Sequence, residues 1–181
     1  SLALHCQTQN TPICVVTGDK DLAQLVLGPD DSWWDFARNR RLDRLGIHAH
    51  FGVHPHQIAD FLALTGDNVD NIPGIPGIGP KTAAALLHHF DNLDAILARI
   101  DEIEWLSLRG AKRVATALKT HQDAARLARQ LTGLANQIDT VHSDPRLDRE
   151  CGCPDSLDAL LDGLGFGQAL RKRLHNAFFD A

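Results

Sequence analysis

Two short segments of this chain carry paired carboxylates at spacings that suit a divalent metal ion. Asp19 and Asp21 follow a short run rich in β-branched residues, whereas Asp67 and Asp70 stand three positions apart after a glycine. Like carboxylates repel one another unless a cation lies between them, and Mg²⁺ or Mn²⁺ prefers hard oxygen ligands. The two pairs therefore predict one divalent site to which all four side chains contribute.

Each of these carboxylates also has an ordinary structural interpretation. An Asp between a strand and a helix is a favoured N-cap, as Asp19 or Asp21 would be. Asp67 and Asp70 lie beside Gly66 and Asn71, where turn chemistry alone explains an aspartate. The alternative to a metal site is therefore a set of helix and turn caps.

A run dense in glycine and proline, from Gly74 to Pro80, precedes a segment typical of a helix. Such a run suits a helix-hairpin-helix, in which glycines let the backbone approach a DNA phosphate and the second helix offers its N-terminal N–H groups. Lys81 would add a positive charge there. A P-loop is disfavoured, because Pro80 removes a backbone N–H where such a loop needs a donor. A plain glycine-capped turn is the alternative.

A basic stretch lies farther along a chain whose overall net charge is −5. Between Arg109 and Arg129 there are six Lys or Arg residues against one Asp, a local net charge of +5. Arg109, Lys112 and Arg113 are spaced to share one helix face, which suits contact with a phosphate backbone but reads no base sequence. An ordinary solvated helix face is the alternative, and it is favoured for Arg126 and Arg129.

The expected elements place these residues at turns and at the starts of helices. Ile13 to Thr17 predicts a strand, apolar residues from Leu22 to Val26 predict a helix after it, and 33–41 suggests a hairpin. Further helices are expected at 58–64, 81–90, 93–100, 109–120, 122–131, 157–164 and 169–178, with an extended stretch at 137–141.

The first strand needs partners, because a parallel βα unit buries its strand inside a sheet covered on both faces. No partner for it is recognisable downstream, so its partners are expected upstream. The expected fold class is therefore α/β, mostly α in this chain, with the chain forming the C-terminal part of a larger α/β protein.

The composition excludes several classes of protein. With 181 residues, 44% of them hydrophobic, the chain can form a real core, and its net charge of −5 argues against coating nucleic acid by bulk charge. No apolar run approaches the roughly 18 residues of a membrane span. The four cysteines lack zinc-site spacing, and the histidines from His48 to His56 are interpreted as solvated. The protein is expected in the cytoplasm.

The most specific signal comes from three collinear segments: VVTGDKDLAQLV (15–26), FGVHPHQIADFLALTGDNVDNIPGIPGIGPKTAAALL (51–87) and LRGAKRVATAL (108–118). Together they resemble the bacterial 5′-3′ exonuclease family, which includes stand-alone flap-endonuclease-like enzymes and the 5′-nuclease domain of DNA polymerase I. The resemblance covers about residues 13–140. It implies the C-terminal part of a PIN-like 5′-nuclease domain with a helix-hairpin-helix of the helix-three-turn-helix type.

The resemblance also implies roles for individual residues. The catalytic carboxylates, which would bind Mg²⁺ or Mn²⁺ as the second half of a two-metal site, are Asp19, Asp21, Asp67 and Asp70. The backbone carbonyls that would hold K⁺ belong to Pro73, Ile75 and Ile78. The DNA-binding set is Gly74, Gly77, Gly79, Lys81, Thr82, Arg109, Lys112 and Arg113.

The activity implied is a structure-selective 5′-3′ exonuclease or flap endonuclease, serving DNA repair and replication near the nucleoid. Its substrate would be DNA with a single-strand/double-strand junction or a 5′ flap. The family's N-terminal portion has no counterpart upstream of Ile13, so an upstream half is an expected partner. The expected division is a nuclease-core remnant at 1–52, the hairpin subdomain at 53–140 and a helical tail at 141–181.

Two other functions are weighed against this one. A non-catalytic duplex-binding module would use the same hairpin while its carboxylates merely cap helices. A nucleotide-binding or hydrolysing protein would use the glycine-rich turn, which the position of Pro80 disfavours.

Overall fold

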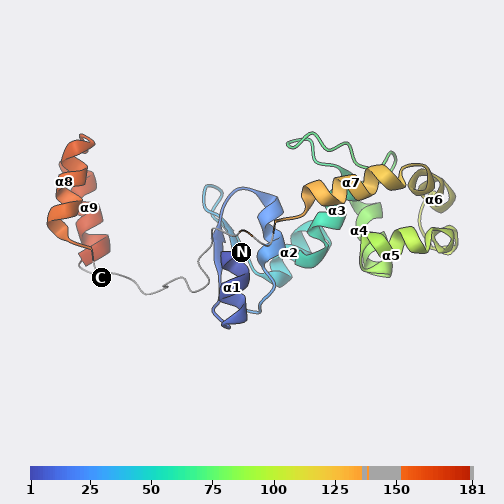
Figure 1. Cartoon of the computed structure of the whole chain (residues 1–181), viewed down its shortest axis with the longest axis horizontal. Coiled ribbons are helices and arrows are strands. Elements are labelled where there is room, and N and C mark those ends of the chain that lie inside the picture. The colour runs from blue at the N-terminus through green and yellow to red at the C-terminus, as the bar shows by residue number, and fades with distance from the viewer. Residues whose placement is uncertain (136–137, 139–151, 180–181) are drawn as a thin grey trace. The chain divides into compact units, whose positions relative to one another are not determined.

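The structure is a computed structural model that describes residues 1–135, 138 and 152–179. The chain forms two compact units, Ser1–Val141 and His142–Ala181 (Figure 1). The extended stretch predicted at 137–141 lies outside the described residues except for Ile138.

A small sheet opens the first unit. Strand β1 (Cys14–Val16) pairs in parallel with β2 (Ser32–Asp35), which pairs in antiparallel fashion with β3 (Arg40–Leu42). The predicted strand and hairpin are therefore confirmed. The expectation that β1 has no partner downstream is wrong, because β2 serves both the hairpin and the parallel pair. Among the described residues no strand covers the other edge of β1.

Helices make up most of the remainder. In the first unit they are α1 (Leu2–Thr8), the 3₁₀ helix η1 (Lys20–Leu25), α2 (Arg44–Phe51), the 3₁₀ helix η2 (Pro55–Gln57), α3 (Ile58–Thr65), α4 (Pro80–Phe90), α5 (Leu93–Ala98), the 3₁₀ helix η3 (Ile100–Trp105), α6 (Ala111–Thr120) and α7 (Gln122–Thr132). In the second unit they are α8 (Pro154–Gly163) and α9 (Gln168–Phe179).

The helices with strong apolar periodicity appear where they were predicted, within a few residues at their ends. The segment after Asp21 forms a 3₁₀ helix, and the segment predicted at 93–100 is divided at Arg99 between α5 and η3. Helices α1 and α2 were not predicted. In α2 only Ile47 is buried, so its start depends on Asp43, whose carboxylate accepts the N–H of Gly46, and not on an apolar stripe.

Helix α3 is the centre of the first unit. Every residue from Ile58 to Leu64 is buried, including the charged Asp60, so the helix must be covered on all sides. It packs against η1, α4 and α7, and α7 runs along it (Figure 1). This packing places the segments after β1 and after α3 next to each other.

In the second unit α8 and α9 pack together. Arg171 of α9 forms ion pairs with Asp158 and Asp162 of α8, and Leu161 is buried. Among the described residues of the whole chain, no helix has the length and apolar character needed to cross a membrane.

A candidate metal centre beside a glycine-rich hairpin

The turn that follows β1 orients two of the predicted carboxylates differently. Asp19 is the N-cap of η1, and its carboxylate accepts the backbone N–H of Asp21 at 3.0 Å. The Trp33 indole N–H donates to the backbone oxygen of Asp19 at 2.9 Å, which ties the turn to β2. The capping interpretation thus describes Asp19, whereas the side chain of Asp21 remains available to another partner.

The other two carboxylates stand in a tight loop after α3. The backbone N–H and carbonyl of Asp67 both bond to Ile72, each at 2.8 Å, so the loop closes on itself. The Asp67 carboxylate accepts the N–H of Val69 at 3.0 Å, and the residue is only 5% exposed. This closure holds Asp67 in place, and Asp70 lies within the same closed loop.

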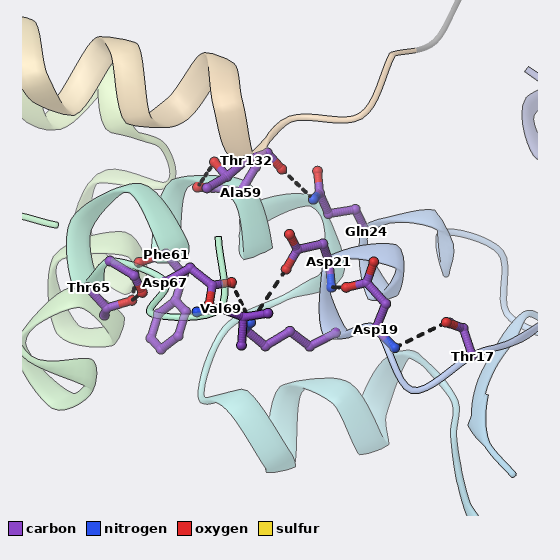
Figure 2. Close-up of polar contacts among 12 residues, drawn as sticks. Thr17, Asp19, Asp21, Gln24, Ala59, Phe61, Thr65, Asp67, Val69 and Thr132 are labelled. Atoms are coloured by element: carbon purple, nitrogen blue, oxygen red, sulfur yellow. Dashed lines mark hydrogen bonds and ion pairs between the residues drawn. The ribbon is translucent and has the colours of Figure 1, made fainter. Parts of the chain in front are cut away.

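The end of α7 links η1, which carries Asp21, to α3, which precedes the loop of Asp67. The Gln24 side-chain amide in η1 donates to the Thr132 carbonyl at 2.8 Å, and the Thr132 hydroxyl donates to the carbonyl of Ala59 in α3 at 2.8 Å (Figure 2). One turn earlier, Arg129 pairs with the buried Asp60 of α3 at 2.6 Å. Arg129, expected to be merely solvated, therefore has a structural role.

Three of the four predicted metal ligands converge. Asp21, Asp67 and Asp70 each offer an oxygen, and these oxygens all lie within 4.8 Å of one another. Asp19 does not belong to this group. In Figure 2 the carboxylates of Asp21 and Asp67 turn toward the same region from η1 and from the loop after α3.

The donor set fits a divalent cation. One carboxylate oxygen of Asp21, Oδ1, is buried and has no hydrogen-bond partner, an arrangement that costs free energy unless a cation satisfies the oxygen. Three convergent carboxylates offer the hard oxygen ligands that such ions prefer, with positions left for water. The residues present therefore suit a metal ion that contacts all three.

The pKa values of the clustered carboxylates also favour a bound cation. The pKa of Asp21 is raised to about 6, mainly by burial, with a smaller contribution from the negative charges of Asp19, Asp67 and Asp70 and against the opposing effect of Lys20. Burial also acts to raise the pKa of Asp67, but hydrogen bonds from Lys20 and from backbone N–H groups outweigh it, so this pKa is lowered. The cluster holds more negative charge than its surroundings neutralise.

Lys20 belongs to the site although the sequence analysis did not select it. Its ammonium group bonds to the Asp67 carboxylate and lies 3.8 Å from the buried Oδ1 of Asp21. Its place between Asp19 and Asp21 was the available signal, because the long, flexible side chain of a lysine can reach a carboxylate held by a neighbouring residue.

The hairpin is joined directly to the loop that carries Asp67 and Asp70. Gly74 packs on Gly66: a Cβ built on Gly74 would lie 2.4 Å from the Gly66 nitrogen, and both glycines have positive φ. The Ile75 N–H donates to the carbonyl of Leu64 in α3 at 2.9 Å. Gly74 is therefore required by the close approach of two backbone segments.

The tip of the hairpin faces open space. A Cβ on Gly77 or on Gly79 would meet no atom within 4 Å, and Gly79 is the N-cap residue of α4. Lys81 in the first turn of α4 is exposed, and Thr82 beside it is half-buried. The surface at these positions is accessible to a large ligand.

The backbone carbonyls predicted to hold K⁺ lie on the same turn. The side chains of Ile75 and Ile78 are each 4% exposed, and the Ile78 N–H donates to the Ile75 oxygen at 3.0 Å. That oxygen retains a second lone pair. Pro73 is exposed.

Helix α6 meets the hairpin across a shallow groove of about 550 Å³, which is lined by Pro76, Gly77, Lys112, Arg113, Thr116 and Ala117. Lys112 and Arg113 are exposed and have no ion pair among the described residues, nor has Arg109 nearby. By contrast, Lys119 pairs with Asp101 and Arg126 with Asp94. Within the basic stretch, the cations without an ion pair among the described residues therefore include the two that line the groove beside the hairpin.

The histidines expected to be solvated form a row. The His48 and His54 rings stack with centroids 4.4 Å apart, His54 and His56 stack at 5.8 Å, and His56 pairs with Asp91 at 3.2 Å. Burial and the neighbouring positive charges lower the pKa of His54.

Residues 53–150 match the protein family described as 5′-3′ exonuclease, C-terminal SAM fold. The chain is 40% identical over 151 residues to a DNA polymerase I of Pseudomonas aeruginosa, covering 83% of this chain and 16% of that protein. It is 32% identical over 168 residues to a 5′-3′ exonuclease of Buchnera aphidicola, covering 93% and 58% respectively. A flap endonuclease Xni of Aeromonas salmonicida is 38% identical over 68% of this chain and 44% of its own length. The chain thus spans only part of each relative.

Solved structures agree on the fold. A bacteriophage T5 5′-exonuclease with bound zinc ions superposes with a TM-score of 0.58 at 22% identity, covering 72% of this chain and 47% of that one. A T5 flap endonuclease in a complex with DNA and metal ions gives a TM-score of 0.59 at 21% identity over the same shares of the two chains.

We expect Gly74→Ala to lower the free energy of unfolding by about 2 kcal/mol or more, because the methyl group would overlap the Gly66 backbone at a positive φ. The matched control is Gly79→Ala, which has open space and a φ of −93°, and it should change stability by less than about 0.5 kcal/mol. Urea unfolding midpoints measure both, and equal losses would contradict the packing described.

We expect Mn²⁺ to raise the Tm of the chain at about pH 7.5, and this gain to shrink as the pH falls below about 6. The pKa of Asp21 is raised to about 6, so at lower pH a proton occupies the carboxylate that the metal needs. Thermal scans across this range measure the effect. Asp21→Asn should lose the gain at every pH, whereas Asp94→Asn, at an exposed surface pair, should keep it. If the carboxylates only cap helices and turns, Mn²⁺ should raise the Tm of neither the wild-type chain nor the two variants.

Proposed function

This chain belongs to the 5′-3′ exonuclease family, and from that premise we propose that it is the C-terminal part of a structure-selective 5′-3′ exonuclease or flap endonuclease acting on DNA. The observation that carries the proposal is the convergence of three carboxylates beside a glycine-rich hairpin with an open tip. Cleavage of a phosphodiester needs the first feature, and a grip on the DNA backbone needs the second.

In this proposal Asp21, Asp67 and Asp70 hold Mg²⁺ or Mn²⁺. Asp19 adds negative charge from the adjacent turn while one of its oxygens caps η1. When bound, such an ion would activate a water molecule and offset the charge that develops on the phosphate during hydrolysis. The protein's own contribution is to keep three carboxylates assembled in a rigid frame, so that the ion is positioned before the substrate arrives.

The hairpin and α6 would hold the duplex by its phosphates. The open faces of Gly77 and Gly79 allow close backbone approach, and the first-turn N–H groups of α4, which include those of Lys81 and Thr82, would donate to a phosphate. Across the groove, Lys112 and Arg113 would meet the same backbone, with Arg109 next to them. These contacts carry affinity and register but no base sequence.

We propose K⁺ as a further ion at the hairpin, held by the carbonyls of Pro73, Ile75 and Ile78. Carbonyl oxygens suit this ion, and the segment has a surplus of them, because the prolines at 73, 76 and 80 supply no N–H. A cation at that point would link the hairpin to a DNA phosphate.

The substrate proposed is DNA with a single-strand/double-strand junction or a 5′ flap, in the cytoplasm near the nucleoid. The partner proposed is the upstream half of the nuclease, and the open edge of β1 supports it by offering unpaired backbone groups to further strands. On this basis residues 1–52 complete a nuclease core, 53–140 form the helix-three-turn-helix subdomain, and 141–181 form a helical tail.

A duplex-binding module without catalysis remains the second candidate, and the N-cap contact made by Asp19 favours it. In this second candidate, Asp21, Asp67 and Asp70 would not be needed for DNA binding, and there would be no cleavage for them to support.

In the complete nuclease, Asp67→Asn and Asp70→Asn should each lower cleavage of a 5′-flap DNA by about 100-fold or more, because a metal ligand is lost. Duplex binding should stay within about threefold, since neither side chain belongs to the hairpin. Single-turnover cleavage and fluorescence anisotropy measure the two effects. Asp101→Asn is the control at an exposed pair and should cleave normally. Full activity in either ligand variant would favour the non-catalytic module.

Lys81→Ala combined with Gly79→Val should weaken duplex binding by about tenfold and flatten its salt dependence by about one unit of slope per lost phosphate contact. Lys119→Ala, whose charge is already paired with Asp101, is the matched control and should change binding little. Anisotropy titrations at several salt concentrations, run in K⁺ and again in Na⁺, measure both. Tighter wild-type binding in K⁺ supports the hairpin ion, and an unchanged curve for the double variant would overturn the hairpin assignment.

A further inference from the structure

One positive charge already lies among the three carboxylates. The Lys20 ammonium bonds to Asp67, lies 3.8 Å from Asp21 Oδ1, and feels the charge of Asp70 as well. Its side chain is 35% exposed, so it reaches the cluster from the solvent side. In the chain without metal, Lys20 therefore supplies part of the positive charge that the cluster needs.

This ion pair differs from the other lysine pair described. Lys119 meets Asp101, whose side chain is 89% exposed, whereas the side chain of Asp67 is only 3% exposed. A buried carboxylate without a counter-charge is costly, while an exposed one is stabilised by water. Removal of Lys20 should therefore matter more than removal of Lys119.

Lys20 nevertheless leaves one oxygen of the cluster without a hydrogen bond. The ammonium is hydrogen-bonded to Asp67 but too far from Asp21 Oδ1 for a hydrogen bond, and that oxygen has no other partner. A divalent ion that contacts all three carboxylates would satisfy it. Such an ion and the ammonium repel each other, so both cannot occupy the space between the same oxygens.

We propose that Lys20 is an internal counter-ion that holds the carboxylate cluster together in the metal-free chain and is displaced toward solvent when a divalent ion binds. This inference rests on the proposed function, because it takes the cluster to be a metal site. Lys20 acts through the carboxylates and is a positioning residue. The flexible four-carbon stem of lysine lets the charge leave without movement of the backbone.

Mg²⁺ binding to the whole 181-residue chain tests the inference. Lys20→Met should lower the Tm without metal and lower the Kd for Mg²⁺ by about tenfold, because the ion no longer has to displace a charge. Lys20→Arg keeps the charge and should restore the Kd to within about threefold of wild type. Lys119→Met removes a comparable lysine at an exposed pair and should leave the Kd unchanged. Isothermal titration calorimetry measures all four proteins.

Displacement is observed directly by NMR after reductive ¹³C-methylation, since the chain has only five lysines and the modification keeps their charge. The Lys20 signal, assigned by its absence in Lys20→Arg, should shift and sharpen on Mg²⁺ addition while that of Lys119 stays in place. This measurement uses the wild-type fold, so it decides the question even if Lys20→Met does not fold.

The two failures are distinguishable. If Mg²⁺ binds the wild-type chain but the Lys20 signal and the Kd of Lys20→Met are unchanged, the displacement is wrong and the metal site stands. If Mg²⁺ binds none of the variants, the metal site and the displacement fall together.

Discussion

The repulsion among three carboxylates confined to one small space governs this structure. Asp21, Asp67 and Asp70 converge although their like charges repel, and burial of Asp21 together with the neighbouring negative charges raises its pKa to about 6. The tertiary frame holds them together, and a cation between them would offset their repulsion. A cluster of this kind is poorly suited to a purely structural role, because separate caps would give the same stability with less repulsion.

The frame consists mainly of backbone contacts. The paired hydrogen bonds between Asp67 and Ile72 close the loop that carries Asp67 and Asp70, and the contact between Gly66 and Gly74 joins that loop to the hairpin. The last turn of α7 then fastens η1 to α3 through Gln24. Because the same short segment supplies carboxylates at one end and the hairpin at the other, the fold and not flexible side chains would set the distance between the proposed metal ion and the proposed DNA contact.

The basic side chains differ in whether they have an acidic partner. The chain is acidic overall, yet Lys112 and Arg113 face the hairpin without partners among the described residues, while Lys119, Arg126 and Arg129 are occupied by internal pairs. A local positive surface on an acidic protein favours contact at one place and disfavours binding along the whole molecule. This distribution agrees with the proposed contact between the hairpin and DNA.

The amino-acid sequence by itself determined the local features, since caps, turns and helical periodicity depend on residues a few positions apart. Pro80 and the glycines before it predicted the hairpin and the start of α4, and the spacing of the aspartates predicted two acidic turns. Tertiary structure alone decided that β2 pairs with β1, that Asp19 caps η1 while Asp21 faces the cluster, and that Arg129 anchors α7. It also brought Lys20 to Asp67, 47 residues away, because contacts between distant segments arise from the packing of η1 on α3 and leave no periodic trace in the chain.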